Sequence, residues 1–165
     1  MANVPFFPSE DLFGDSYVPE AVPKRAGHSC ESCGRFQHCK NPKFPVYGEG
    51  AKGILIVSEF PSASDDASGI PLSGDSGAIL HRELRRLGID LKRDCWTVFS
   101  TRCHSREDFG RKPDGGIRGP KGQESLACRP LMLADISRLK PRVIVPMGVS
   151  AIQGTIGHRL SGRIK

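Results

Sequence analysis

The residues best suited to chemistry in this sequence are its six cysteines, four of which have the arrangement of metal ligands. Cys30 and Cys33 are two residues apart, so both thiolates can point toward one metal centre. Cys103 follows an apolar segment that has the character of a strand, and Cys128 opens a helical pattern. Strand ends and helix starts meet at one edge of a parallel sheet, so we expect these two thiols to join the pair.

The spacing does not decide which metal group the four thiolates would hold. A structural zinc ion takes four thiolates in a tetrahedron, and a 4Fe–4S cluster accepts ligands scattered along a chain equally well. Cys39 could replace one member of the pair as a ligand. Cys95 stands beside the only tryptophan at the start of a strand, which is typical of a small buried apolar residue.

Three carboxylates follow the first predicted strand and form a second candidate site. Glu59 lies directly at the strand end, and Asp65 and Asp66 follow within the same loop. Ligands of open α/β sheets bind beyond the carboxyl ends of the strands, so these groups could position a water molecule or bind a base edge, or simply cap a helix. For Asp75 we predict a structural role, as the N-cap of a helix that starts at Ser76.

Hydrophobic periodicity predicts the elements that would hold these side chains. Short apolar, β-branched runs indicate strands, and apolar residues at helical spacing indicate helices. The predicted strands are 54–57, 96–99 and 142–145, and the predicted helices are 76–87, 124–139 and 148–156. This alternation predicts an α/β fold, a three-layer α/β/α arrangement with a short central parallel sheet.

Composition indicates a cytoplasmic globular protein without a membrane span. The chain has 165 residues, a net charge of +6 and no apolar run of membrane length, and its N-terminus does not resemble a signal peptide. Clustered thiols in a reducing compartment are typical metal ligands, and the positive charge suits DNA as a partner. We expect a monomer, with a flexible arm over residues 1–27 and one domain over 28–165. The polar loop over 104–123 is expected to be a solvated insertion, with direct phosphate contact as the alternative.

The order of several motifs resembles the family 4 uracil-DNA glycosylases, in the uracil-DNA glycosylase-like superfamily. The similarity covers roughly Cys30 to the C-terminus and is carried by the order of the motifs rather than by any one of them. These motifs are Cys30–x–x–Cys33, the strand and loop 54–62, the pair Asp65–Asp66, the glycine-containing segment 69–77, Asp94–Cys95–Trp96, Cys103, the segment 127–131 and the segment 140–148.

The resemblance implies hydrolysis of the N-glycosidic bond of uracil, or of a related damaged base, in DNA for base-excision repair. Such an enzyme extrudes the nucleotide into a pocket and reads its base edge. The resemblance implies a 4Fe–4S cluster rather than zinc, as a structural group on Cys30, Cys33, Cys103 and Cys128. It further implies catalytic roles for Glu59, Asp65 and Asp66, and substrate-binding positions at Phe60, Pro61, Leu72 and Phe99.

Several positions depart from the family pattern. Phe60 and Ser62 stand where the first motif has small residues, Leu72 replaces the aromatic residue that stacks on uracil, and Phe99 replaces the asparagine that reads the base. A site that has lost its hydrogen-bonding reader loses much of its discrimination. The family's later His-containing motif is also absent before Lys165, which suggests a C-terminally truncated or phage-type member. The alternative function is a catalytically inactive, iron–sulfur-stabilised DNA-binding module.

Overall fold

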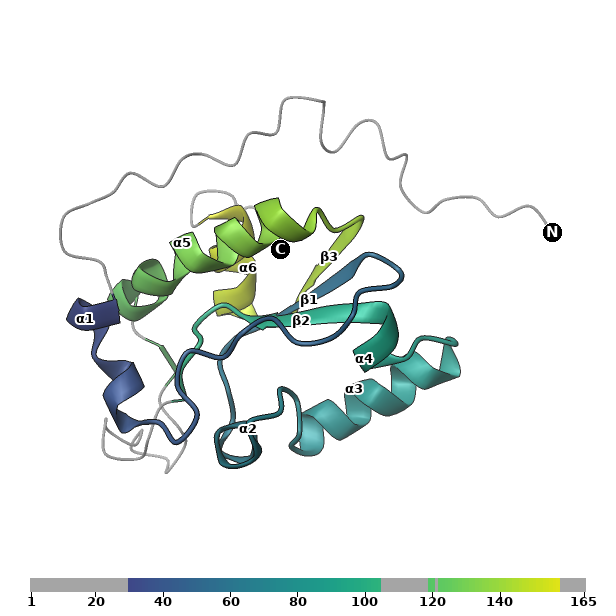
Figure 1. Ribbon diagram of the computed structural model, residues 1–165, viewed down its shortest axis with the longest axis horizontal. Coiled ribbons are helices and arrows are strands. Elements are labelled where there is room, and N and C mark those ends of the chain that lie inside the picture. Colours follow the sequence, from purple (N-terminus) through teal and green to yellow (C-terminus); the bar gives the residue numbers. More distant parts are fainter. Residues whose placement is uncertain (1–29, 105–118, 121, 158–165) are drawn as a thin grey trace.

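The computed structural model describes residues 30–104, 119–120 and 122–157, so the predicted arm and most of the predicted polar loop lie outside the described residues. The elements alternate along the chain as predicted (Figure 1). They are α1 (Cys30–Cys33), the 3-10 helix η1 (Arg35–His38), β1 (Ile54–Ser58), α2 (Ala63–Ser68), α3 (Asp75–Arg86), α4 (Leu91–Asp94), β2 (Cys95–Phe99), α5 (Gly122–Leu139), β3 (Val143–Pro146) and α6 (Val149–Ile156).

The three strands form one parallel sheet in the order β2-β1-β3. β1 is the central strand and is covered on both faces, so Leu55, Ile56 and Val57 are all buried. Ser58 is level with Phe99 at the carboxyl ends of β1 and β2. Residues that follow these strands therefore emerge side by side at one edge of the sheet.

Side-chain alternation along β1 divides the core into two layers. Leu55 and Val57 pack with Met132 of α5 and Ala151 of α6 on one face. Ile56 packs on the other face, in the cluster that contains Leu91 and contacts α3. Figure 1 shows α5 and α6 on one side of the sheet and α3 and α4 on the other. The predicted three-layer α/β/α architecture is confirmed.

β3 lies at one edge of the sheet, and its apolar side chains are exposed. Val143, Ile144 and Val145 are 53%, 37% and 40% exposed, although their sequence is as apolar as that of β1. Within the described residues, β1 is the only strand that pairs with β3. Burial of an apolar strand is therefore set by its place in the sheet, which its sequence does not reveal.

Helix boundaries show where local prediction was incomplete. α1, η1, α2 and α4 were not predicted, because helices of four to six residues are too short to show an apolar period. Cys128 lies inside α5 rather than at its start, and Gly74 rather than Asp75 is the N-cap of α3. In the parts of the chain that the structure describes, no helix has both the length and the hydropathy needed to cross a membrane.

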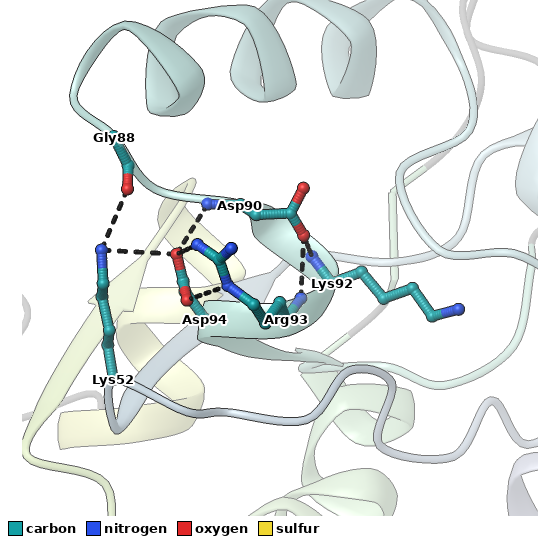
Figure 2. Close-up of polar contacts among 6 residues, drawn as sticks. All are labelled: Lys52, Gly88, Asp90, Lys92, Arg93 and Asp94. Carbon is teal, nitrogen blue, oxygen red and sulfur yellow. Dashed lines mark hydrogen bonds and ion pairs between the residues drawn. The ribbon is translucent and has the colours of Figure 1, made fainter.

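A buried aspartate fixes the end of the sheet opposite to the strand-end loops. Asp94, 2% exposed, accepts hydrogen bonds from the Arg93 guanidinium at 2.8 Å and from the Asp90 backbone N–H at 2.8 Å (Figure 2). Lys52 lies 3.4 Å away and also donates to the carbonyl oxygen of Gly88. Hydrogen bonding from Arg93 and Asp90 holds the pKa of Asp94 well below its usual range. The network connects the turn before β1 to α4.

Candidate functional site

Three separate segments bring the predicted cysteine ligands to one side of the domain. Cys30 and Cys33 lie on α1, which packs against α5, the helix that carries Cys128. Cys103 lies in the segment that follows β2, and the backbone N–H of Lys43 donates to its Sγ at 3.4 Å. Figure 1 shows α1 beside the N-terminal part of α5.

The electrostatics of these thiols show that they are neighbours. Burial is the main cause that raises the pKa of Cys128 to about 11, and the charges of Cys103, Cys33 and Cys30 act in the same direction. Burial likewise raises the pKa of Cys103 to about 11, again with contributions from the other thiols, Cys39 included. Such thiols stay protonated at neutral pH unless a nearby cation stabilises the thiolates, which is what a bound metal does.

The described residues are not arranged as a metal-binding site. No group of three or more Cys, His, Asp or Glu side chains among them is arranged so that it could hold a metal ion. All six cysteines are free thiols. What the site offers is its set of donor groups: four thiols on neighbouring segments, of which Cys103 and Cys128 are buried.

A buried arginine connects the segments that carry the cysteines. Arg35, 2% exposed, donates from Nη1 to Oε2 of Glu124 on α5 at 2.8 Å and from Nη2 to the carbonyl oxygen of Cys103 at 3.2 Å. Burying an unpaired charge is costly, so the ion pair between Arg35 and Glu124 makes the burial of both charges less unfavourable. Arg35 also places a positive charge among the thiols, where it lowers the pKa of Cys39 against the larger upward effect of burial.

His104 connects the cysteine segment to the loop after β1. Nδ1 of this buried side chain donates to the carbonyl oxygen of Pro61 at 2.7 Å. The backbone carbonyl of His104 in turn lies 3.3 Å from the Cys39 thiol. The loop after β1 is thus held directly by the residue that follows a predicted ligand, Cys103.

Glu59 lies at the carboxyl end of β1 and contacts the first turn of α6. Its Oε1 accepts hydrogen bonds from the backbone N–H of Ser150 at 3.0 Å and from the Ser150 hydroxyl at 2.9 Å. Gly148 lets the carboxylate approach, because a Cβ there would lie 2.3 Å from Glu59 Cδ. A carboxylate at a helix N-terminus is favoured by the helix dipole, and this contact fixes the Glu59 side chain beyond the strand ends.

Asp65 and Asp66 accept hydrogen bonds mainly from backbone N–H groups and share no partner with Glu59 among the described residues. Asp65 forms a capping box with Ser62 at the start of α2, and its Oδ1 also accepts from the backbone N–H of Ser73 at 2.7 Å. Asp66 accepts from the backbone N–H groups of residues 40 and 41 at 3.0 and 2.8 Å. Both side chains are buried and tie loops together, and their catalytic role stays a prediction.

The predicted substrate-binding residues have different surroundings. Phe60 and Leu72 are half-buried, Pro61 is buried, and Phe99 is 1% exposed with its ring edge-on to Phe44 at a centroid distance of 5.4 Å. Leu72 has a left-handed backbone with φ 58 and packs against the apolar cluster under α3. Phe99 thus acts as a core residue at the position predicted to face the substrate, and its role in binding stays a prediction.

Sequence reasoning missed Arg35, His104 and Ser150. The partners of Arg35 and Ser150 lie 89 and 91 positions away in the chain, and Pro61 lies 43 positions from His104. A single arginine or histidine in a polar segment gives no periodic signal, so only the assembled fold reveals these contacts.

Comparison with known proteins agrees with this fold and this residue order. The family model of the uracil DNA glycosylase superfamily matches residues 44–164. A type-4 uracil-DNA glycosylase of Pyrobaculum aerophilum is 33% identical over 79% of the chain and 63% of its own length. The corresponding protein of Thermotoga maritima is 33% identical over 65% of the chain and 52% of its length, and that of Saccharolobus solfataricus is 28% identical over 72% and 50%.

These matches confirm the resemblance that the motifs predicted. The chain spans between half and two thirds of the length of these curated relatives. The matched range begins at Phe44 and includes the sheet, the loop after β1 and the helices on both faces. The chain belongs to the uracil DNA glycosylase superfamily.

Proposed function

We propose that the chain is a DNA N-glycosylase of the uracil-DNA glycosylase type, which hydrolyses the bond between uracil and deoxyribose for base-excision repair. Superfamily membership supports the reaction class. The observation that carries the proposal is Glu59, whose carboxylate is fixed by Ser150 at the carboxyl end of the central strand. Ligands of parallel α/β sheets bind at that edge.

The proposed chemistry begins when the target nucleotide is extruded from the duplex into this edge of the sheet. Water then attacks the sugar as the bond to the base breaks, so positive charge develops on the sugar and negative charge on the base. Among the described residues, no donor contacts Oε2 of Glu59, so this oxygen can orient the water or stabilise the cationic sugar. Phe60, Pro61 and Leu72 would border the base.

We assign Cys30, Cys33, Cys103 and Cys128 as the residues that would hold a 4Fe–4S cluster, with zinc as the alternative. Their location on neighbouring segments, the burial of two of them and the resemblance to iron–sulfur glycosylases support the assignment. Bound iron would supply the positive charge that the buried thiolates need. In this proposal the cluster is structural, since it would join α1, α5 and the segment after β2, which contacts the loop at Pro61 through His104.

A second function, a DNA-binding module without catalysis, is favoured by one specific observation. Phe99 is buried against Phe44 at the position where the family reads the base, and a phenyl ring offers no hydrogen bond to a base edge. A pocket without that reader would discriminate poorly between uracil and other bases. Binding to the DNA backbone through basic side chains would not need it.

A single-turnover assay on duplex oligonucleotides separates the two functions. One strand carries one uracil, the control duplex carries thymine at that position, and alkali cleaves any abasic product. We expect cleavage of the uracil strand only. Binding of both duplexes without cleavage, measured by fluorescence anisotropy at the same salt concentration, would support the module and contradict the glycosylase. Failure to bind either duplex would contradict both.

A further inference from the structure

The outer face of α3 carries a positively charged surface that takes no part in the site described above. A shallow hollow there is lined by Ala78, His81, Arg82, Arg85 and Arg86. Ile79 lies beside it on the same helix and is 54% exposed. We call these six residues the α3 basic face. Figure 1 shows α3 as an outer helix of the layer below the sheet.

The charges on this face are only partly neutralised. Glu83 is the acidic side chain next to the hollow, and it pairs with both Arg82 and Arg86, each at 2.9 Å. Arg85 adds a further positive charge, which helps to lower the pKa of Asp90 at the neighbouring turn after the more important hydrogen bonds to that carboxylate. The α3 basic face therefore suits a partner that combines negative charge with large apolar side chains, because it offers both guanidinium groups and Ile79.

The chain contains a segment of that composition. Residues 1–23 include four acidic residues and no Lys or Arg, although the whole chain has 24 Lys and Arg and a net charge of +6. The acidic residues alternate with large apolar ones: Phe6, Phe7, Glu10, Asp11, Leu12, Phe13, Asp15, Tyr17 and Glu20. We propose that residues 6–20, called here the acidic arm segment, bind to the α3 basic face.

Tethering favours this occupant over a separate molecule. The nine residues from 21 to 29 can span up to about 30 Å when extended, close to the diameter of about 35 Å expected for a domain of this size. A tethered segment binds at a high effective concentration, so weak contacts with a few arginines are enough. A nucleic-acid backbone would match the arginines but would leave Ile79 without an apolar contact, which makes it the less complementary partner.

Photo-cross-linking in the full chain tests the proposal. Phe13 is replaced by p-benzoylphenylalanine, which keeps an aromatic ring at that position, and mass spectrometry after illumination identifies the attachment points. We expect intramolecular cross-links within residues 78–87. The double variant Arg82→Glu/Arg85→Glu should lower their yield about fivefold or more, and so should about 0.5 M NaCl, where screening is strong. The exposed pair Arg138→Glu/Arg142→Glu, at the end of α5 and the start of β3, is the matched control and should leave the yield unchanged.

Three results would overturn the proposal. They are cross-links to the exposed edge of β3 or to other elements, cross-links between two chains, and a yield that charge reversal on α3 does not alter. If the α3 double variant keeps its cross-links but binds duplex DNA less tightly, the face serves nucleic acid instead.

Circular dichroism establishes that the double variant folds. If it does not fold, neutralising Glu10, Asp11, Asp15 and Glu20 by amide substitution must produce the same loss of cross-links.

Discussion

At the scale of single residues, Glu59 shows how the fold converts an ordinary carboxylate into a candidate reactive group. Its Oε1 is fixed by the backbone and the side chain of Ser150, so its position is set by α6 rather than by solvent. Asp65 and Asp66 are carboxylates of the same loop, but backbone N–H groups of other segments occupy their oxygens. The difference between these three carboxylates is one of hydrogen-bond partners, which the sequence does not display.

We expect Glu59→Gln to lower the single-turnover rate of uracil release about 10²-fold or more, because the neutral amide cannot stabilise a cationic sugar or accept a proton from water. The amide oxygen can still accept the Ser150 hydrogen bonds, so the melting temperature should change little. Asp66→Asn is the comparison: it should lower the melting temperature more than the rate. An unaltered rate in Glu59→Gln would remove Glu59 from the proposed site.

The cysteines make a second prediction at this scale. Cys128→Ser should lose bound iron and the visible absorbance of an iron–sulfur cluster, because a buried proposed ligand is removed. Cys39→Ser is the matched control, since Cys39 is a neighbouring half-buried thiol outside the predicted ligand set. It should retain its iron. The reverse outcome, iron lost from Cys39→Ser and kept by Cys128→Ser, would show that Cys39 is the ligand.

At the scale of elements, the contact between α3 and the turn before it depends on one glycine. A Cβ on Gly77 would lie 1.8 Å from the carbonyl oxygen of Leu72, whose own backbone has a left-handed φ of 58. The backbone of Leu72 cannot move away from such a Cβ unless α3 shifts as well. The turn that presents Leu72 and the helix that follows are therefore one packed unit.

Gly77→Ala should accordingly destabilise the protein by about 1–3 kcal/mol, the usual cost of overpacking a buried position. Gly122→Ala is the matched control, because a Cβ there meets nothing within 4 Å at the start of α5. It should be neutral or slightly stabilising, since alanine has the higher helix propensity. Urea unfolding of both variants checks this. Equal stabilities for the two variants would show that α3 can shift freely at its N-terminus.

The Asp94 network makes a prediction about pH. Arg93, the Asp90 backbone and Lys52 lower the pKa of Asp94 from its ordinary value of 3.8, so the folded state holds the charged form more strongly than the unfolded chain does. This stabilisation is present above about pH 4 and is lost progressively as the pH falls further. Asp94→Asn should therefore lower the melting temperature most at neutral pH and progressively less below about pH 4. A difference in melting temperature that does not vary with pH would contradict this role.

At the scale of the whole molecule, the sequence predicts the architecture better than it predicts the site. The three strands are evident because each is a short β-branched run, and α3 is evident from its apolar face. α2 was missed because Ala63–Ser68 has no apolar period, and only the Ser62 and Asp65 capping box marks it. The exposure of β3 was also not predictable, because a strand's neighbours are set by chain connections and not by its own composition.

The sequence predicts which residues belong to the candidate site, but it does not predict the contacts that hold them in place. Cys30 and Cys33 and the carboxylate of Glu59 are candidates because thiols at a two-residue spacing and a carboxylate after a buried strand are local patterns. Cys103 and Cys128 are candidates through their predicted places at a strand end and a helix start and through the resemblance. Arg35, His104 and Ser150 act across 43 to 91 positions of sequence, so their roles arise only when the sheet brings distant loops together. These contacts connect the proposed cluster to the strand-end loop.

The central proposal for this protein is that the four cysteines hold a 4Fe–4S cluster. The direct measurement is the iron, acid-labile sulfide and zinc content of the full chain, purified without oxygen and quantified per polypeptide. We predict about four iron and four sulfide atoms per chain and no stoichiometric zinc. One zinc ion per chain without sulfide, or a metal-free folded protein, would contradict the claim.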